Sequence, residues 1–577
     1  MPKKVSKQKL KRQKAKIKKQ LAKEKKKKVP KKEIKARQKK RAKARSNFMA
    51  DLIPALGFGI FIGALLAIAA GPKIAVLGVA GVPVLMLSFK YPRQAIWAFL
   101  IYMPFAGTVV YALGGNAILQ LAKDAFYLPG LYGSLQYCKK IRAKFVAEPR
   151  LILPLAILLL FCLITFLTEN VPQQLELFEN IPPELNTNPY KNDKSPFLLG
   201  VLGAKVFLGY IPLIFVTYHF LRNKKDVLTL TRLHTILAIV CAGLGVLQYL
   251  MLSSGRCAGT DHLTGDDLFK ASIEARCLVG GSLLWSPSQG VIRLPGTFVA
   301  PWQWAWFLIG NAFLTYTTAF NDPSKRWRLI GLLALAGIFV NAVISGQRIA
   351  LALVPVCVIL CLIITGQIAD LKKFVPIGGG IIVFICLAFV LFPDLIQERV
   401  DSFVSRWEAA PADDFIGGQF GEISHLIRDH FFGRGLGRAT NSARIFGRVF
   451  LVETWYPKVM LEVGYIGLAA FLGFTSAITW FTFRAYRAVK TPSLRGIGAS
   501  YWVFILFISY QTYYYPLDVD PVAVYYWVMV GAVLKLPAID KAEQKRMKEL
   551  VAAGLFVPGL GRRQIAQQFP GGCVGSA

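Results

Sequence analysis

The sequence predicts an all-α protein, a polytopic transmembrane helical bundle with a large helical loop outside the cytoplasm near its C-terminus. Hydrophobic residues make up 54% of the 577 residues and the mean hydropathy is +0.46, which exceeds the apolar content of most soluble chains. Apolar stretches of roughly 17–25 residues recur along the chain, and each is long enough to cross a bilayer. About 12–14 spans are therefore predicted.

A basic segment precedes the first span. Residues 1–45 hold 24 Lys or Arg and only two acidic residues, Glu24 and Glu33. Such a composition buries too little surface to offset ordering, so residues 1–47 are predicted to be a cytoplasmic tail that is disordered or transiently helical and rests on anionic membrane lipids. Nucleic acid is not expected as a partner, because the tail lacks interleaved aromatic residues. A secretory signal peptide is not expected, because no apolar core follows the basic residues at once.

The apolar stretches follow one another along most of the chain. In chain order they are roughly 52–70, 73–89, 95–113, 117–137, 151–168, 197–221, 228–252, 298–320, 327–344, 348–366, 374–393, 455–482, 498–515 and 521–536. Each is expected to be one transmembrane helix, because in lipid the backbone must satisfy its own hydrogen bonds.

Lys and Arg fall in every second break between these stretches. The basic breaks lie at 90–93, 139–144, 222–225, 325–328, 372–373, 484–490 and 541–548. The positive-inside rule therefore predicts that both termini are cytoplasmic. The expected parts are the tail 1–47, a transmembrane bundle 48–393, a large external loop 394–454, C-terminal transmembrane helices 455–536 and a cytoplasmic tail 537–577.

Three external breaks are long enough to have structure: 169–196, 253–297 and 394–454. The second contains Cys257 and Cys277, the two cysteines that share one external loop. A disulfide between them is expected in an oxidising compartment. The cysteines within apolar spans are expected to act as small hydrophobic residues.

Two arginines lie on the external side, against the positive-inside bias. Arg293 precedes the span at 298–320, whose start carries a tryptophan cluster that includes Trp302, and Arg348 follows the turn between two spans. Guanidinium groups bind phosphate oxygens in a bidentate manner, so the pair fits a diphosphate-linked lipid. The alternative is that the tryptophans form an interfacial belt and the arginines reach for lipid headgroups.

The large external loop is basic and ends in a glycine-rich turn. It carries Arg428, His430, Arg434 and Arg438, which predicts an anionic ligand. His430 is a candidate base, although a loop histidine also fits a structural or solvated role. The loop is expected to contain amphipathic helices.

The order of these motifs resembles the O-antigen ligase and O-antigen polymerase superfamily of bacterial inner-membrane proteins. The matching segments are Arg293–Phe298 (Arg-x-x-Gly-x-Phe), Ser345–Arg348 (Ser-Gly-x-Arg), Phe432–Gly437 (a Gly-x-Gly-x-Gly stretch) and Glu462–Gly467 (Glu-x-Gly-x-x-Gly). They cover roughly residues 200–535. The resemblance implies a periplasmic location for the large loop and a place for the protein in surface polysaccharide biosynthesis, including that of lipopolysaccharide.

What the resemblance implies is a glycosyltransferase that moves a glycan from undecaprenyl diphosphate to a lipid or glycan acceptor, as a ligase or a polymerase. Arg293 and Arg348 would hold the diphosphate. The chain departs from the family at the His-Asn pair, which falls on Glu453 and Thr454, so Glu453 would activate the acceptor hydroxyl. No cofactor is expected, and no metal is required because the arginines supply the positive charge.

Two other functions stay open. The same superfamily includes proteins linked to inorganic-carbon uptake, so a membrane transporter is one alternative, with Asp124, Lys123 and Lys205 as its candidate ionisable groups within spans. A non-catalytic membrane scaffold is the other, because Glu453 replaces the family histidine. An unchanged surface polysaccharide in an Arg348 variant would favour the scaffold.

Overall fold

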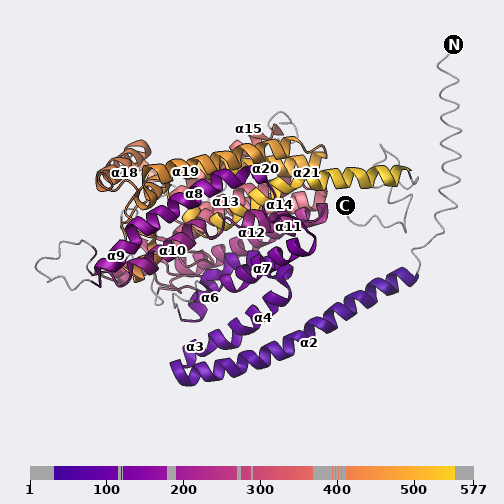
Figure 1. Ribbon diagram of the computed structural model, residues 1–577, viewed down its shortest axis with the longest axis horizontal. Helices are drawn as coiled ribbons and strands as arrows, with labels where there is room; N and C mark the ends of the chain where they lie inside the picture. The colour runs from indigo at the N-terminus through magenta and orange to yellow at the C-terminus, as the bar shows by residue number, and fades with distance from the viewer. Residues whose placement is uncertain are drawn as a thin grey trace, which may run out of the picture. The chain divides into compact units, whose positions relative to one another are not determined.

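The computed structural model describes residues 31–552 except 115–118, 120, 179–189, 191, 269–274, 288–289, 368–392 and most of 394–410. The chain divides into two compact units. The small unit comprises the described residues of 1–87, 223–225 and 539–577, and the large unit those of 88–222 and 226–538. Apart from one two-stranded sheet, the elements of the described residues are helices (Figure 1).

Eight helical stretches among the described residues are long and apolar enough to cross a membrane. They are Arg45–Ala69, Pro92–Ala112, Pro149–Glu176, Pro196–Phe220, Lys224–Ser253, Lys325–Ile344, Trp455–Arg487 and Val522–Glu549. Ile74–Lys90 and Arg348–Ile364 are shorter apolar helices at two further predicted spans. The predicted class, an all-α multi-pass membrane protein, is thus confirmed.

Four predicted spans match neither the eight long apolar helices nor the two shorter ones. α13 (Pro301–Asn321) and α20 (Pro492–Tyr510) lie at 298–320 and 498–515, but their polar residues lower the mean hydropathy. At 117–137 the helix is α7 (Asp124–Lys140), which begins later than expected. The predicted span 374–393 lies outside the described residues except for its last position.

The small unit is built on one long helix. α2 (Lys31–Ala70) runs without a break from the basic segment into the apolar span, and α3 (Pro72–Val76), a π-helical turn (Leu77–Gly81) and the start of α4 (Val82–Lys90) return along it. Residues 31–47, predicted to be disordered or transiently helical, are helical here. Their Lys, Arg and Ala residues are strong helix formers.

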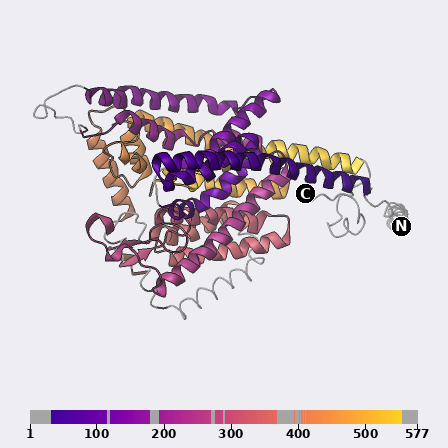
Figure 2. The ribbon, with the colours of Figure 1, turned by 90° about the horizontal axis from the view of Figure 1, so that it is seen from below.

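The large unit is organised around α13. This helix packs against α14 (Lys325–Ile344), α15 (Arg348–Ile364) and α20 and runs among the helices of the unit (Figures 1 and 2). Every residue from Trp304 to Ala319 is buried. A helix that is covered on all sides forms the core of a bundle. α19 (Trp455–Arg487) packs against α20 and against α8 (Ile152–Thr165).

The remaining helices of the large unit are shorter or flank this core. They are α5 (Pro92–Tyr102), α6 (Ala106–Ala112), α9 (Val171–Glu176), α10 (Pro196–Leu208), α11 (Leu213–Phe220), α12 (Lys224–Ser253), α18 (Ala412–Leu426) and α21 (Val522–Ala552), the last of which continues into the small unit. α18 lies in the predicted large loop, so the described part of that loop is partly helical, as expected.

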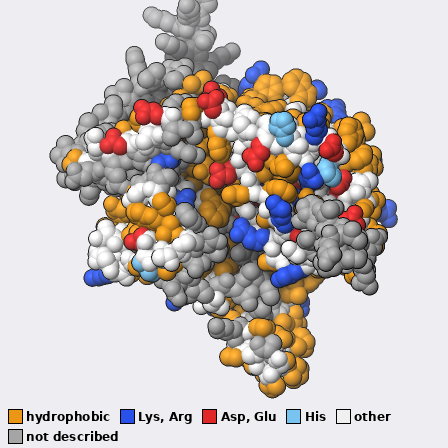
Figure 3. Space-filling model, turned by 90° about the vertical axis from the view of Figure 1, so that its left-hand side faces the viewer, with side chains coloured by type: hydrophobic (Ala, Val, Ile, Leu, Met, Phe, Trp, Pro, Cys, Tyr) orange, Lys and Arg blue, Asp and Glu red, His pale blue; other side chains and the backbone are white. Residues whose placement is uncertain are grey.

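At one end of the large unit, loops and short elements replace the long helices. β1 (Leu284–Ser286) and β2 (Val291–Arg293) form an antiparallel hairpin in the loop that follows α12. The end at which α9 and α18 lie presents Lys, Arg, Asp, Glu and His side chains among hydrophobic ones (Figure 3). The predicted site residues that belong to loops, among them Arg293 and Glu453, lie at this loop-rich end.

Candidate functional site

Arg293 lies at the end of β2, where the chain meets the turn before α15. Its strand partner is Leu284 of β1, and the backbone N–H of Leu294 donates to the carbonyl of Ser345 at 2.9 Å. Gly346 has a left-handed φ of 68°, and a Cβ atom there would lie 3.4 Å from the Arg293 Cα. The structure therefore brings Arg293 against the Ser345–Arg348 turn, and Arg348 is the first residue of α15.

Glu453 lies in an extended segment that pairs with the loop between α20 and α21. The N–H of Tyr514 donates to the Glu453 carbonyl at 2.9 Å, and Thr454 forms an isolated bridge with Tyr513. Gln419 of α18 fixes the segment from the other side, because its Oε1 accepts from the N–H groups of Glu453 and Thr454 at 3.1 and 3.0 Å.

Arg293, Glu453, Tyr514 and Tyr515 interact electrostatically and form what we call the arginine–glutamate cluster. Burial lowers the pKa of Arg293, whereas Tyr514, Glu453 and Tyr515 raise it. Burial, together with Asp518, Glu453 and Tyr514, raises the pKa of Tyr515. Arginine side chains are not deprotonated in proteins, so the cluster presents a fixed positive charge beside Glu453.

Two buried donors beside this contact have no hydrogen-bond partner among the residues the structure describes. They are Arg293 Nε and Gln347 Nε2, the latter within the turn that packs on Arg293. A buried donor without an acceptor costs about 1–3 kcal/mol. The two donors and the guanidinium charge suit an oxygen-rich anionic ligand.

A small pocket lies next to the cluster along the chain. Its walls include Thr440, Trp455, Lys458, Glu462 and Asp518. Lys458 forms a buried ion pair with Asp518, and Glu462 accepts a hydrogen bond from the Thr440 hydroxyl at 3.0 Å. Burial raises the pKa of Asp518, and Lys458 opposes that shift. The pocket therefore holds two carboxylates and one ammonium group.

The glycine-rich turn is a packing element. A Cβ atom at Gly433 would lie 2.6 Å from the Gly464 nitrogen, and one at Gly437 would lie 2.3 Å from the Leu199 carbonyl oxygen. Both glycines have a left-handed φ, of 83° and 84°. Only glycine satisfies both conditions. The turn is thereby held between α10 and a kink in α19 at Gly464.

Arg438 lies in the protein interior. Its side chain is fully buried and pairs with Asp193 at 2.5 Å, and it also donates to Gln173 and to the Arg448 carbonyl. The guanidinium lies 3.7 Å from the centre of the Tyr190 ring. These contacts give Arg438 a structural place, distinct from the arginine–glutamate cluster.

The other predicted ligand-binding residues also have contacts of their own. Arg434 Nε and Nη2 donate to the Leu426 carbonyl at 2.9 and 2.5 Å, which closes the C-terminal end of α18. His430 Nδ1 lies 3.4 Å from a Glu169 carboxylate oxygen. Arg428 is exposed, and Trp302 is half-buried in the first turn of α13.

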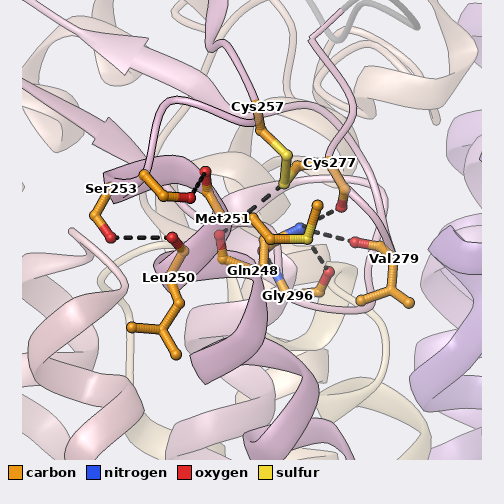
Figure 4. The surroundings of a disulfide bond; sticks show 9 residues. Gln248, Leu250, Met251, Ser253, Cys257, Cys277, Val279 and Gly296 are labelled. Carbon is orange, nitrogen blue, oxygen red and sulfur yellow. Dashed lines mark hydrogen bonds between the residues drawn. A yellow bond between two sulfur atoms is a disulfide. The ribbon is translucent and has the colours of Figure 1, made fainter.

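Cys257 and Cys277 form a disulfide in the loop that leads to Arg293 (Figure 4). Their Cα atoms lie 5.5 Å apart, and 20 positions separate them in the chain. The disulfide fastens residues just after α12 to the segment before the β-hairpin.

Sequence reasoning did not single out several residues of this region. Tyr514 and Tyr515 are the last residues of the predicted stretch 498–515 and belong to no recognisable motif, and Gln347 occupies the variable position of the Ser-Gly-x-Arg turn. Asp518 lies in the short break between the stretches 498–515 and 521–536 and belongs to no recognisable motif. The left-handed φ values of Tyr514 and Tyr515, 60° and 34°, belong to the backbone and leave no sequence signal.

No protein-family model matches the chain, and no curated protein matches it. The assignment of a function therefore depends on the four motifs and on the geometry of the arginine–glutamate cluster.

Proposed function

We propose that this membrane protein is an O-antigen ligase-like glycosyltransferase that moves a glycan from undecaprenyl diphosphate to a lipid or glycan acceptor. In this proposal the loop-rich end of the large unit faces the periplasm and both termini are in the cytoplasm of a bacterial cell. The reaction serves surface polysaccharide biosynthesis. Ligase and polymerase activities share this chemistry.

One observation carries the proposal. Arg293, the Ser345–Arg348 turn and Glu453 come from three separate parts of the chain. The end of β2 contacts the turn, and Glu453 interacts electrostatically with Arg293. The unpartnered donors of Arg293 and Gln347 lie at the same place. Arginines on the external side run against the positive-inside bias, which supports a functional role for Arg293 and Arg348.

The proposed chemistry is a displacement at the anomeric carbon of the lipid-linked sugar. The acceptor hydroxyl oxygen forms the new bond to that carbon while Glu453 takes the hydroxyl proton. The bond between the carbon and the diphosphate oxygen breaks, and the diphosphate keeps the electron pair. Arg293 and Arg348 stabilise the charge that develops on this leaving group, an effect typically worth about 3–4 kcal/mol per donor.

The test is the polysaccharide profile of a strain that lacks the gene. It is complemented with the wild type, Arg348→Ala, Glu453→Gln or Arg326→Ala, where Arg326 is an exposed control in the basic break 325–328, and membrane insertion is checked for each. The first two variants are expected to insert and yet fail to restore the polysaccharide, and lipid-linked glycan should accumulate. Full restoration by both would refute the proposed roles.

A transporter is the second candidate, and two partly buried ion pairs favour it. Lys123 pairs with Asp520, and Lys205 pairs with Asp124 at 3.0 Å. Ionisable groups within a membrane bundle often mark an ion path. Flux of bicarbonate or protons into proteoliposomes that is lost in Lys123→Met, without any effect of Glu453→Gln, would favour transport over glycan transfer.

A further inference from the structure

Gln248 connects the disulfide loop to the segment that carries Arg293, and we propose that it is a positioning residue for Arg293. This inference rests on the proposed function. Gln248 lies on α12 and is fully buried. Its Nε2 donates to the carbonyls of Cys277 and Val279 at 3.1 and 2.7 Å (Figure 4).

The same amide also bonds to the segment after Arg293. Gln248 Oε1 accepts from the Gly296 N–H at 3.0 Å, and Nε2 lies 3.4 Å from the Gly296 carbonyl oxygen. One side chain thus joins residues 277–279 to a residue three positions beyond Arg293. A single primary amide has the donors and the acceptor that these backbone groups need.

The backbone itself shows how close the two segments are. A Cβ atom at Gly280 would lie 1.9 Å from the Gly296 carbonyl oxygen, and one at Gly296 would lie 2.4 Å from the Trp304 ring. Both glycines have a left-handed φ, 88° and 56°. The disulfide then ties Cys277 to the end of α12. Gln248 therefore occupies the centre of a tightly packed contact.

Arg293 is held from two directions by this arrangement. On one side the Gln248 bonds fix Gly296, and on the other the Leu294 N–H is bonded to Ser345. A guanidinium binds a diphosphate in a bidentate manner only if its position is well defined. Loss of the Gln248 amide would release the segment, and the position of Arg293 would vary.

The variant that tests this is Gln248→Met, which keeps the approximate side-chain volume and removes every hydrogen bond of the amide. Its matched control is Gln174→Met on α9, whose side-chain oxygen accepts hydrogen bonds from Ser195 and Phe197 at the start of α10. Binding of undecaprenyl diphosphate to the purified full chain is measured for each variant, with Arg293 intact and with Arg293→Ala.

Gln248→Met is expected to weaken undecaprenyl diphosphate binding by about tenfold when Arg293 is present, and by about twofold or less in the Arg293→Ala protein. Gln174→Met is expected to leave binding unchanged. Equal weakening by Gln248→Met in both backgrounds would assign Gln248 a general structural role. Unchanged binding in the Gln248→Met protein would also overturn the inference.

Backbone hydrogen exchange separates a failure of this inference from a failure of the proposed function. If the wild type does not bind undecaprenyl diphosphate, the proposed function is wrong, and exchange over residues 291–297 then decides the inference. Faster exchange there in Gln248→Met than in Gln174→Met supports the positioning of Arg293 by Gln248. Equal exchange in the two variants refutes it.

Discussion

Replacement of Arg438 by methionine tests whether this arginine holds the fold together. The Arg438 side chain is 0% exposed and that of Asp193 is 3% exposed. Besides the 2.5 Å ion pair, Arg438 donates to Gln173 and to a backbone carbonyl. Arg438→Met removes the cation and leaves the Asp193 carboxylate buried without it.

The expected cost is about 3–5 kcal/mol, the range for removing one partner of a buried ion pair. Asp193→Asn should cost a similar amount, because it leaves the Arg438 charge unpaired. The double variant Arg438→Met with Asp193→Asn removes both charges, so its cost is expected to be far below the sum of the single costs.

Thermal unfolding of the detergent-solubilised protein measures these effects. The control is Arg428→Met, which changes an exposed arginine of the same loop and is expected to leave the unfolding temperature unchanged. If Arg438→Met unfolds at the wild-type temperature, or if the double variant costs the sum of both single variants, the structural role of the ion pair is refuted.

Three further predictions concern stability. Gly464→Ala is expected to lower the free energy of unfolding by at least about 1 kcal/mol, because Gly464 has a φ of 70° and an added Cβ would lie 2.2 Å from a carbonyl oxygen. Gly473 has open space around it, so Gly473→Ala should not destabilise the protein, and thermal unfolding of both variants checks this. Burial raises the pKa of Asp518 above 3.8, so the folded chain keeps a proton that the unfolded chain loses, and stability should fall as pH rises just above that value. Asp518→Asn should remove that slope, and an identical slope in wild type and variant would contradict the assignment. Cys257→Ser is expected to cost about 3 kcal/mol, because the disulfide to Cys277 spans 20 positions. In the wild type, peptide mass should show Cys257 and Cys277 alkylated only after reduction, and their alkylation without reduction would show that the disulfide is absent.

The fold class was predictable because apolar spans and basic breaks are local features of the sequence. The predicted residues Arg293 and Arg348 belong to local motifs, whereas Glu453 is the point at which the chain departs from the family pattern. The structure places Arg293 near both Glu453 and the turn that precedes Arg348. What the sequence does not show is the partner of each residue. A bulky polar side chain in a basic loop looks the same whether it faces a ligand or the interior.

Arg438 illustrates this limit. Its partner Asp193 is 245 positions away, so no local pattern indicates that the charge is buried. Gln248 is a single polar residue in an apolar helix, and its four contacts lie 29 to 48 positions further along the chain. Tyr514 reaches Glu453 only because the loop after α20 pairs with the start of α19. Partners so far apart in the sequence are recognised only in the three-dimensional structure.

Helix boundaries show a second limit. Residues 31–47 were expected to stay disordered or transiently helical because of their charge. In the structure they form the first part of α2, whose apolar stretch begins at Arg45. Nucleation is the costly step in helix formation, and an adjoining stable helix removes it. Composition alone does not report such a neighbour.

The central claim is that the arginine–glutamate cluster and the turn before Arg348 form a site for a diphosphate-linked lipid. Native mass spectrometry of the purified full chain with undecaprenyl diphosphate, undecaprenyl monophosphate and undecaprenol tests it most directly. The wild type is expected to prefer the diphosphate, and the preference should disappear in Arg293→Ala with Arg348→Ala but persist in Arg326→Ala, which changes an exposed arginine at the start of α14. Equal binding of the three lipids by the wild type would contradict the claim.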